Sequence, residues 1–472
     1  MKKLKVGLVG LMHQNFPGDK ENTFRIISDD FKKIANDYKF TPYIIEKGII
    51  TEDDALKAYH EILAQNIDLL MVCNIQFASG KIIAILADLP VYLGLWSLPE
   101  STSCGPLPAN SFCGMNMNSS ILKEYLGVDQ YKWFYGNITD QWFIARFRIT
   151  LKSLQTIKNT KNTKMAIIGG MADGFDNQYY DERRIYEKYR VKIIRSLEFD
   201  DIYDRMKSYH DQDIEEIRNK IVANVCFISE LAADKIDDTV RLIKTIIDFK
   251  KEMDLAAIAL NCWPKYRQKL DMVACAAIGF LNQLGIPTAC EGDVYGMLSM
   301  YLLRQLSPDP TLLMDLVDFA ETEQSLLFWH CGVGCKSLAE QEEVRLTAHS
   351  NPAFIPGRGM KKHAPVADMI YKKGKATVVR ITNHGGNLFI LAGRFKNPEK
   401  PSFDGSRGWL GDLQFNFEPI TVQDVINTIL VNGIQHHYAI ALGDYSKEMS
   451  EIAYWLDLKM VNKNKYQDFL QN

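Results

Sequence analysis

Short apolar runs alternate with amphipathic segments through the first third of the chain. The apolar runs span 3–12, 40–45, 68–73 and 90–95, and helix-like segments lie between them at 22–38 and 52–65. Strands separated by helices form a parallel sheet with helices packed on both faces, because a helical crossover brings the next strand back in the same direction. The alternation therefore predicts an α/β domain built on a parallel sheet.

The same alternation begins again at Lys164 and predicts a second α/β domain. Strand candidates follow at 191–194, 222–228 and 255–260, and helical candidates lie at 180–189, 214–220 and 235–253. The polar segment 155–164, rich in Lys, Asn and Thr, separates the two patterns and is typical of a loop between domains.

Beyond about residue 322 the pattern changes to short alternating segments divided by Gly, Pro and Asn. Strand candidates at 326–329, 376–382 and 388–391 precede a helix at 422–431, a strand at 437–442 and a helix at 447–456. Alternation with a period of two indicates a half-buried sheet and favours a small barrel. The predicted fold class is α/β: two Rossmann-like parallel-sheet domains, 1–160 and 161–322, followed by a smaller β-rich, barrel-like C-terminal domain, 323–472.

Composition argues against several classes of function. The net charge of −3 over 472 residues, without long runs of one charge, argues against nucleic acid as a partner. No apolar stretch reaches the roughly 18 residues that cross a membrane, and the first apolar run is too short for a signal sequence. Nine cysteines without CxxC pairs fit reduced, mostly buried thiols. We therefore expect a cytoplasmic protein.

Two carboxylates stand one residue apart in Cys290-Glu291-Gly292-Asp293. A Gly-Ile-Pro break precedes this segment, and a helix-like run, 297–306, follows it. Acidic side chains at the start of a helix stay ionised near the positive end of its dipole. Ionised oxygens serve a divalent metal or an acid–base step on a sugar. The alternative is structural, since Glu291 or Asp293 could cap the helix N-terminus.

Three further positions could act with these carboxylates. Asp315 lies inside an apolar run, His330 ends another, and His436-His437 open the strand candidate at 437–442. Asp315 could instead occupy the exposed face of a helix, and His330 could be a core histidine. Strand alternation directs only one of the paired histidines inward. Carboxylates and imidazoles together suit Mn²⁺, Fe²⁺, Co²⁺ or Zn²⁺ better than Ca²⁺.

In order and spacing, these motifs resemble those of the L-fucose/L-arabinose isomerase family. That family has a Glu-X-Asp motif, a second carboxylate about two dozen residues later, a following His and a late His-His before a strand. Here these are Glu291-Gly-Asp293, Asp315, His330 and His436-His437. The resemblance is best over about residues 255–460. It implies an intramolecular oxidoreductase, an aldose–ketose isomerase that acts through a cis-enediol.

The resemblance also implies roles for individual residues. Glu291, Asp315 and His437 are expected to bind a divalent metal, with Mn²⁺ as the expected ion and His330 beside it in contact with the sugar. Glu291 and Asp315 would also be the catalytic pair that transfers protons.

The family's active sites lie between the subunits of a homotrimer or homohexamer. The N-terminal domain of one chain would therefore close over the site of the next. His13 and Gln14, in the loop after the first strand, would bring substrate contacts from that neighbour. Trp263, in the motif Asn261-Cys-Trp-Pro264, is expected to contact the sugar within its own chain.

The loop 97–116 is similar to one in sulfoquinovose isomerases, which implies conversion of sulfoquinovose to sulfofructose. A sulfonate requires a fixed cation, and Arg suits multi-point recognition of its oxygens. Arg358 is the candidate we select. The sequence offers others in Arg267, Lys361, Arg394 and Arg407.

Three alternatives remain open at this level. The chain could isomerise an unsulfonated sugar of the L-fucose, D-arabinose or L-arabinose type. Two α/β lobes also fit a non-catalytic sugar-binding protein. A nucleotide could bind at Gly169–Gly174, although that turn lacks the full GxGxxG spacing.

Overall fold

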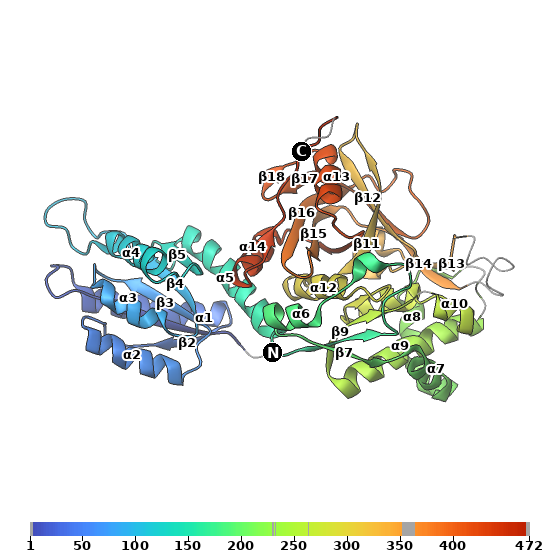
Figure 1. Cartoon of the computed structure of the whole chain (residues 1–472), viewed down its shortest axis with the longest axis horizontal. Helices are drawn as coiled ribbons and strands as arrows, with labels where there is room; N and C mark the ends of the chain where they lie inside the picture. Colours follow the sequence, from blue (N-terminus) through green and yellow to red (C-terminus); the bar gives the residue numbers. More distant parts are fainter. Residues whose placement is uncertain (1–2, 229–230, 232, 263, 352–363, 469–472) are drawn as a thin grey trace. The chain divides into compact units, whose positions relative to one another are not determined.

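The computed structural model describes residues 3–228, 231, 233–262, 264–351 and 364–468 (Figure 1). The chain divides into two compact units, an N-terminal unit, Met1–Asn159, and a C-terminal unit, Thr160–Asn472. None of the helices in these ranges combines the length and the apolarity that are needed to cross a membrane.

The N-terminal unit is built on a five-stranded parallel sheet of order β2-β1-β3-β4-β5. Its strands are β1 (Lys5–Leu11), β2 (Thr41–Ile44), β3 (Leu69–Asn74), β4 (Tyr92–Ser97) and β5 (Tyr131–Tyr135). Its helices are α1 (Lys20–Asp37), α2 (Glu52–Ala64), α3 (Gly80–Ala87), α4 (Ser111–Ser120) and α5 (Gln141–Thr160). Strand β3 is buried at every position and β1 and β4 at all but their first, which explains their unbroken apolar character.

The C-terminal unit begins with a second parallel sheet, of order β10-β9-β6-β7. Its strands are β6 (Lys164–Ile168), β7 (Lys192–Leu197), β9 (Leu255–Leu260) and β10 (Thr288–Ala289). Its helices are α6 (Glu182–Tyr189), α7 (Phe199–Ser208), α8 (Asp211–Ala223), α9 (Ala233–Met253), α10 (Lys265–Leu270), α11 (Cys275–Gln283) and α12 (Val294–Leu306).

The strand that we predicted at 222–228 is reduced to two residues, β8 (Phe227–Ile228). Helix α8 extends to Ala223 and takes the first part of that segment. Its buried residues, Ile214 and Ile221, are seven positions apart and therefore lie on one helical face. The burial of these two residues on one helical face explains why the start of the predicted strand is helical instead.

A closed barrel follows, and its six strands pair with one another antiparallel. They are β11 (Leu312–Ala320), β12 (Ser325–His330), β15 (Gly374–Thr382), β16 (Asn387–Lys396), β17 (Ser406–Phe415) and β19 (His437–Leu442). The order β16-β15-β19-β11-β12-β17 closes because β17 also pairs with β16. Outside it lie β13 (Arg345–Ala348), β14 (Pro365–Ile370), β18 (Glu418–Pro419), β20 (Lys459–Met460), α13 (Val422–Val431) and α14 (Ser446–Trp455). The two parallel-sheet folds and the β-rich C-terminal part confirm the predicted fold class.

Helix α12 joins the parallel sheet to the barrel. It contacts β9 and β10 of the sheet and β11, β15 and β19 of the barrel. Figure 1 shows it between β9 and the labelled barrel strands β11 and β15. Eleven of its thirteen residues are buried, so its apolar character extends around the whole helix. Its N-terminus is therefore held inside the unit, where the second sheet and the barrel meet.

Candidate active site

The turn between β10 and α12 carries the two carboxylates of the Glu-Gly-Asp motif. Glu291 and Gly292 both have left-handed backbone, with φ of 58° and 72°. Asp293 is the N-cap of α12, and its Oδ1 accepts a hydrogen bond from the backbone N–H of Gly296 at 2.8 Å. The capping alternative therefore describes Asp293 correctly, but the cap is only one of its contacts.

A glycine-rich turn packs directly against this motif. The backbone N–H of Ala172 donates to the carbonyl oxygen of Glu291 at 3.1 Å. A Cβ atom at Gly292 would lie 2.3 Å from the carbonyl oxygen of Gly170, so only glycine allows this approach. The Gly169–Gly174 segment, considered above for nucleotide binding, is thus used to support the carboxylate turn.

Asp293 forms a completely buried ion pair with Arg380 of β15. The guanidinium approaches both carboxylate oxygens: Nη1 donates to Oδ2, and Nη2 donates to Oδ1 at 3.1 Å. Both side chains have an exposed fraction of 0%. Burial by itself would raise the pKa of Asp293, but Arg380 and His437 hold that pKa well below its ordinary range. Asp293 is therefore a permanent anion in the interior.

Asp293 also fixes the orientation of His437. Nδ1 of this histidine lies 3.0 Å from Oδ2 of Asp293, and since the carboxylate can only accept, Nδ1 carries the proton. Nε2 is then the free nitrogen, and it points to the other side of the ring. Carboxylates that hold a histidine in this way are typical partners of metal-binding imidazoles.

The two catalytic carboxylates of the sequence prediction meet at Nε2 of His437. Oε2 of Glu291 and Oδ1 of Asp315 each lie 3.4 Å from it. Strand pairing explains the position of Asp315, because β11 and β19 align Asp315 directly opposite His437. Asp315 therefore lies on a barrel strand, and the alternative of an exposed helical face is wrong.

His330 lies in the same cluster but is held differently. Its Nδ1 accepts a hydrogen bond from the backbone N–H of Cys331 at 2.9 Å, so its ring proton is on Nε2. Nε2 lies 3.0 Å from Sγ of Cys290, which is itself 3.8 Å from Nε2 of His437. His330 thus lines the site with a donor group.

His436 also reaches the site, which strand alternation did not predict. Its Nε2 lies 3.5 Å from Oε2 of Glu291, and its Nδ1 lies 3.2 Å from Nδ2 of Asn177. The alternation rule fails because β19 begins only at His437, which leaves His436 in the preceding turn. His436 is 36% exposed, whereas His437 is 1% exposed.

The electrostatics of the cluster favour a cation beside His437. Burial by itself would lower the pKa of His437, but its interactions with Cys290, Asp293 and Asp315 raise that pKa well above its ordinary value. Burial would raise the pKa of Glu291, yet the neighbouring histidines hold it below its usual range. The surroundings that draw a proton onto the ring would equally hold a metal ion in its place.

One buried oxygen tests whether these residues fit a metal. Oδ1 of Asp315 is buried and has no hydrogen-bond partner among the residues that the structure describes. Such a group costs roughly 1–3 kcal/mol or more unless a cation or a donor compensates it. Two carboxylates and one imidazole are also a donor set that suits Mn²⁺. The donor groups therefore fit a divalent metal, and Glu291, His436 and His437 bring one ligand atom each within 4.8 Å of one another.

Two contributors to the site were missed by the sequence reasoning. Gln178, completely buried in the short 3₁₀ turn η2 (Asp176–Gln178), donates from Nε2 to Oε2 of Glu291 at 3.2 Å. Arg380 is the partner of Asp293. An Arg inside the apolar run of β15 was a visible signal, since a buried charge needs a partner. Gln178 gave no comparable signal.

The other residues predicted to contact the substrate belong to segments that do not form this cluster. His13 and Gln14 follow β1 in the N-terminal unit, where the backbone carbonyl of His13 accepts a hydrogen bond from Lys20 Nζ at 2.6 Å. Trp263, Arg358 and Lys361 lie outside the described residues. Arg407 pairs with Asp368 and is therefore already neutralised.

Comparison with known proteins agrees with the motifs. This chain is similar to sulfoquinovose isomerases. The protein of that name from Alkalicoccus urumqiensis is 26% identical over 424 residues, which cover 88% of this chain and 90% of that protein. Those from Priestia aryabhattai and Clostridium sp. (strain MSTE9) are 24% and 25% identical and cover 88% and 83% of this chain, and 90% and 85% of those proteins.

These similarities confirm the relationship that the motifs indicate, and with it the interpretation of the chain as an aldose–ketose isomerase, an intramolecular oxidoreductase. No protein-family model matches the sequence. Among solved structures, a glucose–galactose binding protein from Geobacillus stearothermophilus shares 13% identity over 57% of this chain and 82% of that chain. The TM-score of this match is 0.17, which is too low to support a conclusion about fold or function.

Proposed function

We propose that the protein is a metal-dependent aldose–ketose isomerase that converts sulfoquinovose to sulfofructose. The observation that carries the proposal is the convergence of Glu291 and Asp315 on the free nitrogen of His437. One oxygen of Asp315 is buried there and forms no hydrogen bond with the described residues. The similarity to sulfoquinovose isomerases over most of the chain supports the choice of sugar.

The reaction moves one proton between C2 and C1 of the open-chain sugar and exchanges protons between O1 and O2. Glu291 is the better base, because its neighbouring histidines keep its carboxyl ionised. Glu291 then carries the proton from C2 and can return it to C1, while Asp315, which faces the same point from the barrel, can pass a proton between O1 and O2. His330, with its proton on Nε2, can donate a hydrogen bond to a sugar oxygen. A divalent cation, when bound, would supply Lewis-acid polarisation of the carbonyl.

The buried pair behind the site keeps this arrangement rigid. Asp293 and Arg380 hold His437 in one tautomer, and Gln178 holds one oxygen of Glu291. Side chains held in this way need little reorganisation during the reaction. For the sulfonate we retain Arg358 as the proposed cationic partner, because a guanidinium can donate hydrogen bonds to two oxygens of one anion at once.

Nuclear magnetic resonance in D₂O tests the proposed function. Enzyme loaded with Mn²⁺ should form a deuterium-labelled ketose from sulfoquinovose and not from L-fucose, D-arabinose or L-arabinose. Exhaustive chelation should abolish the reaction, and added Mn²⁺ should restore it. Turnover of an unsulfonated sugar alone would transfer the proposal to that substrate. Unchanged turnover after chelation would exclude the metal, and no reaction in metal-loaded enzyme would contradict the isomerase.

We also propose that the protein acts as a homotrimer or homohexamer, with His13 and Gln14 completing a neighbour's site. Support comes from the resemblance described above and from the position of both residues at the carboxyl end of β1, where ligands of parallel sheets bind. Sedimentation velocity at working concentration should show a trimer or a hexamer. An active monomer would contradict this assembly.

A further inference from the structure

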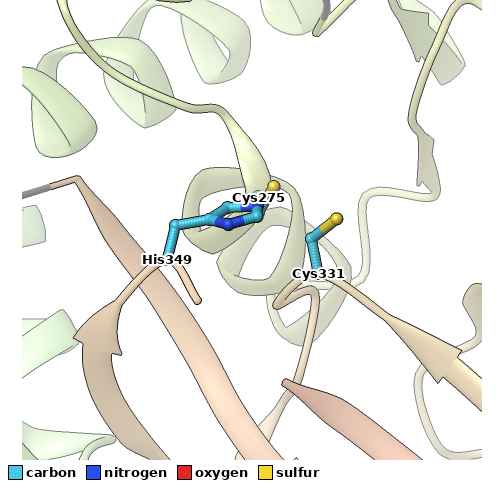
Figure 2. A group of neighbouring side chains, drawn as sticks. All are labelled: Cys275, Cys331 and His349. Atoms are coloured by element: carbon cyan, nitrogen blue, oxygen red, sulfur yellow. The ribbon is translucent and has the colours of Figure 1, made fainter. Parts of the chain in front are cut away.

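A second group of metal-binding side chains lies outside the carboxylate site. Cys275, Cys331 and His349 each present one ligand atom, and these three atoms lie within 4.8 Å of one another. Figure 2 shows the imidazole of His349 beside the thiol of Cys275, with the thiol of Cys331 at the edge of the same group. Cys331 is within hydrogen-bonding reach of both partners.

The three residues come from separate segments of the C-terminal unit. Cys275 is the first residue of α11, Cys331 directly follows β12, and His349 directly follows β13. The side chains of Cys275 and His349 are buried and that of Cys331 is half-buried. Neither cysteine forms a disulfide. Only the tertiary fold therefore brings these three residues together, since their spacing in the sequence matches no known zinc motif.

The chemistry of the group fits Zn²⁺ better than Mn²⁺. Two thiolates and one imidazole are soft ligands, whereas the carboxylates of Glu291 and Asp315 are hard ones. Two thiolates around Zn²⁺ also give a neutral complex. A neutral complex suits the apolar surroundings, which include Val273 and Val366. Without a metal, the two thiolates would carry two negative charges into these apolar surroundings.

The geometry requires only a small closure. Zn–S bonds of about 2.3 Å at tetrahedral angles separate two sulfurs by roughly 3.8 Å, and the ligand atoms here are at most 4.8 Å apart. Nδ1 of His349 accepts a hydrogen bond from the backbone N–H of Asn351 at 3.0 Å, so a metal would bind this ring at Nε2. Binding at Nε2 would move the ring proton to Nδ1 and exchange that one hydrogen bond, a small cost beside a zinc–thiolate site.

We propose that Cys275, Cys331 and His349 form a structural zinc site, with a water as the fourth ligand. The half-buried side of Cys331 gives that water access. The site would tie the start of α11 to the ends of β12 and β13. It would thereby fix the residue that follows His330 and position one wall of the carboxylate site.

Metal analysis of the full-length protein tests this site. Protein produced with both Zn²⁺ and Mn²⁺ and freed of loosely bound metal should retain one zinc per chain by mass spectrometry. Cys331→Ser and Cys275→Ser should lose that zinc. Cys335→Ser, which removes a buried free thiol four residues away, should keep it. Glu291→Gln should also keep it, which separates this proposal from the function of the carboxylate site.

Cobalt provides a readout that does not depend on activity. Wild-type protein reconstituted with Co²⁺ should show thiolate-to-cobalt charge-transfer absorption, and Cys331→Ser should lack it. Absence of zinc and of this absorption in folded wild-type protein would overturn the proposal. So would a disulfide between Cys275 and Cys331 in the freshly purified protein.

Discussion

Replacing Glu291 by Gln should lower kcat by at least about 10³-fold while the fold stays intact. General acid–base groups contribute roughly 10²–10⁴-fold to rate, and the same residue is a proposed metal ligand. The substitution preserves shape and removes the negative charge that faces His437. Gln178 can still hydrogen-bond to the new amide oxygen, so the turn should keep its conformation. Ketose formation from sulfoquinovose with saturating Mn²⁺ measures the effect.

The control for this experiment is Glu187→Gln, which makes the same chemical change at an exposed position of α6. It should leave turnover and the melting temperature unchanged. Circular dichroism and the melting curve of Glu291→Gln should match those of the wild-type protein. A variant that retains wild-type turnover would remove Glu291 from the mechanism.

Replacing Arg380 by Met should destabilise the C-terminal unit by about 3–5 kcal/mol, the usual cost of leaving one charge of a buried pair without its partner. Asp293 is 0% exposed and would remain with only His437 and the helix cap to compensate its charge. The change in the free energy of unfolding can be measured by denaturant titration. Weaker orientation of His437 should also lower the affinity for Mn²⁺ by roughly 10–100-fold.

Two matched variants show whether burial of the charge is the cause. Arg195→Met breaks an ion pair with Glu182 at the surface, where Arg195 is 75% exposed, and should cost less than about 1 kcal/mol. Adding Asp293→Asn to Arg380→Met removes the unpaired charge and should recover part of the lost stability. Equal losses for Arg380→Met and Arg195→Met would contradict the account of a buried pair.

The pattern of apolar residues was sufficient to predict a helix or a strand wherever a single period, helical or strand-like, dominated the segment. The predicted helix at 422–431 and strand at 437–442 match α13 and β19. The buried residues of α13 recur at helical spacing, and β19 is a short apolar run that is buried throughout. The prediction of a strand at 222–228 was wrong because the apolar residues there fit both a helical and a strand period. Only tertiary packing decided between the two. The barrel was expected from its short alternating strands, but its closure through β16 and β17 was not.

Some residues of the candidate site could likewise be predicted from the sequence, and others could not. Glu291, Asp315, His330 and His437 could be selected from the sequence because hard ligands and imidazoles are conspicuous next to apolar runs. The register of β11 against β19, which places Asp315 opposite His437, could not be selected, since strand pairing depends on residues far apart in the chain. Arg380, Gln178 and the group of Cys275, Cys331 and His349 likewise became visible only in three dimensions.

By itself, the sequence determined the fold class, the apolar periods and the types of ligand that this protein carries. Those properties are local, because a helix, a strand or an ionised side chain is specified by near neighbours. The tertiary structure alone decided which histidine nitrogen is free, which carboxylate is paired with an arginine and which oxygen remains without a partner. These properties depend on distances of a few ångströms between segments more than a hundred residues apart, and only packing sets such distances.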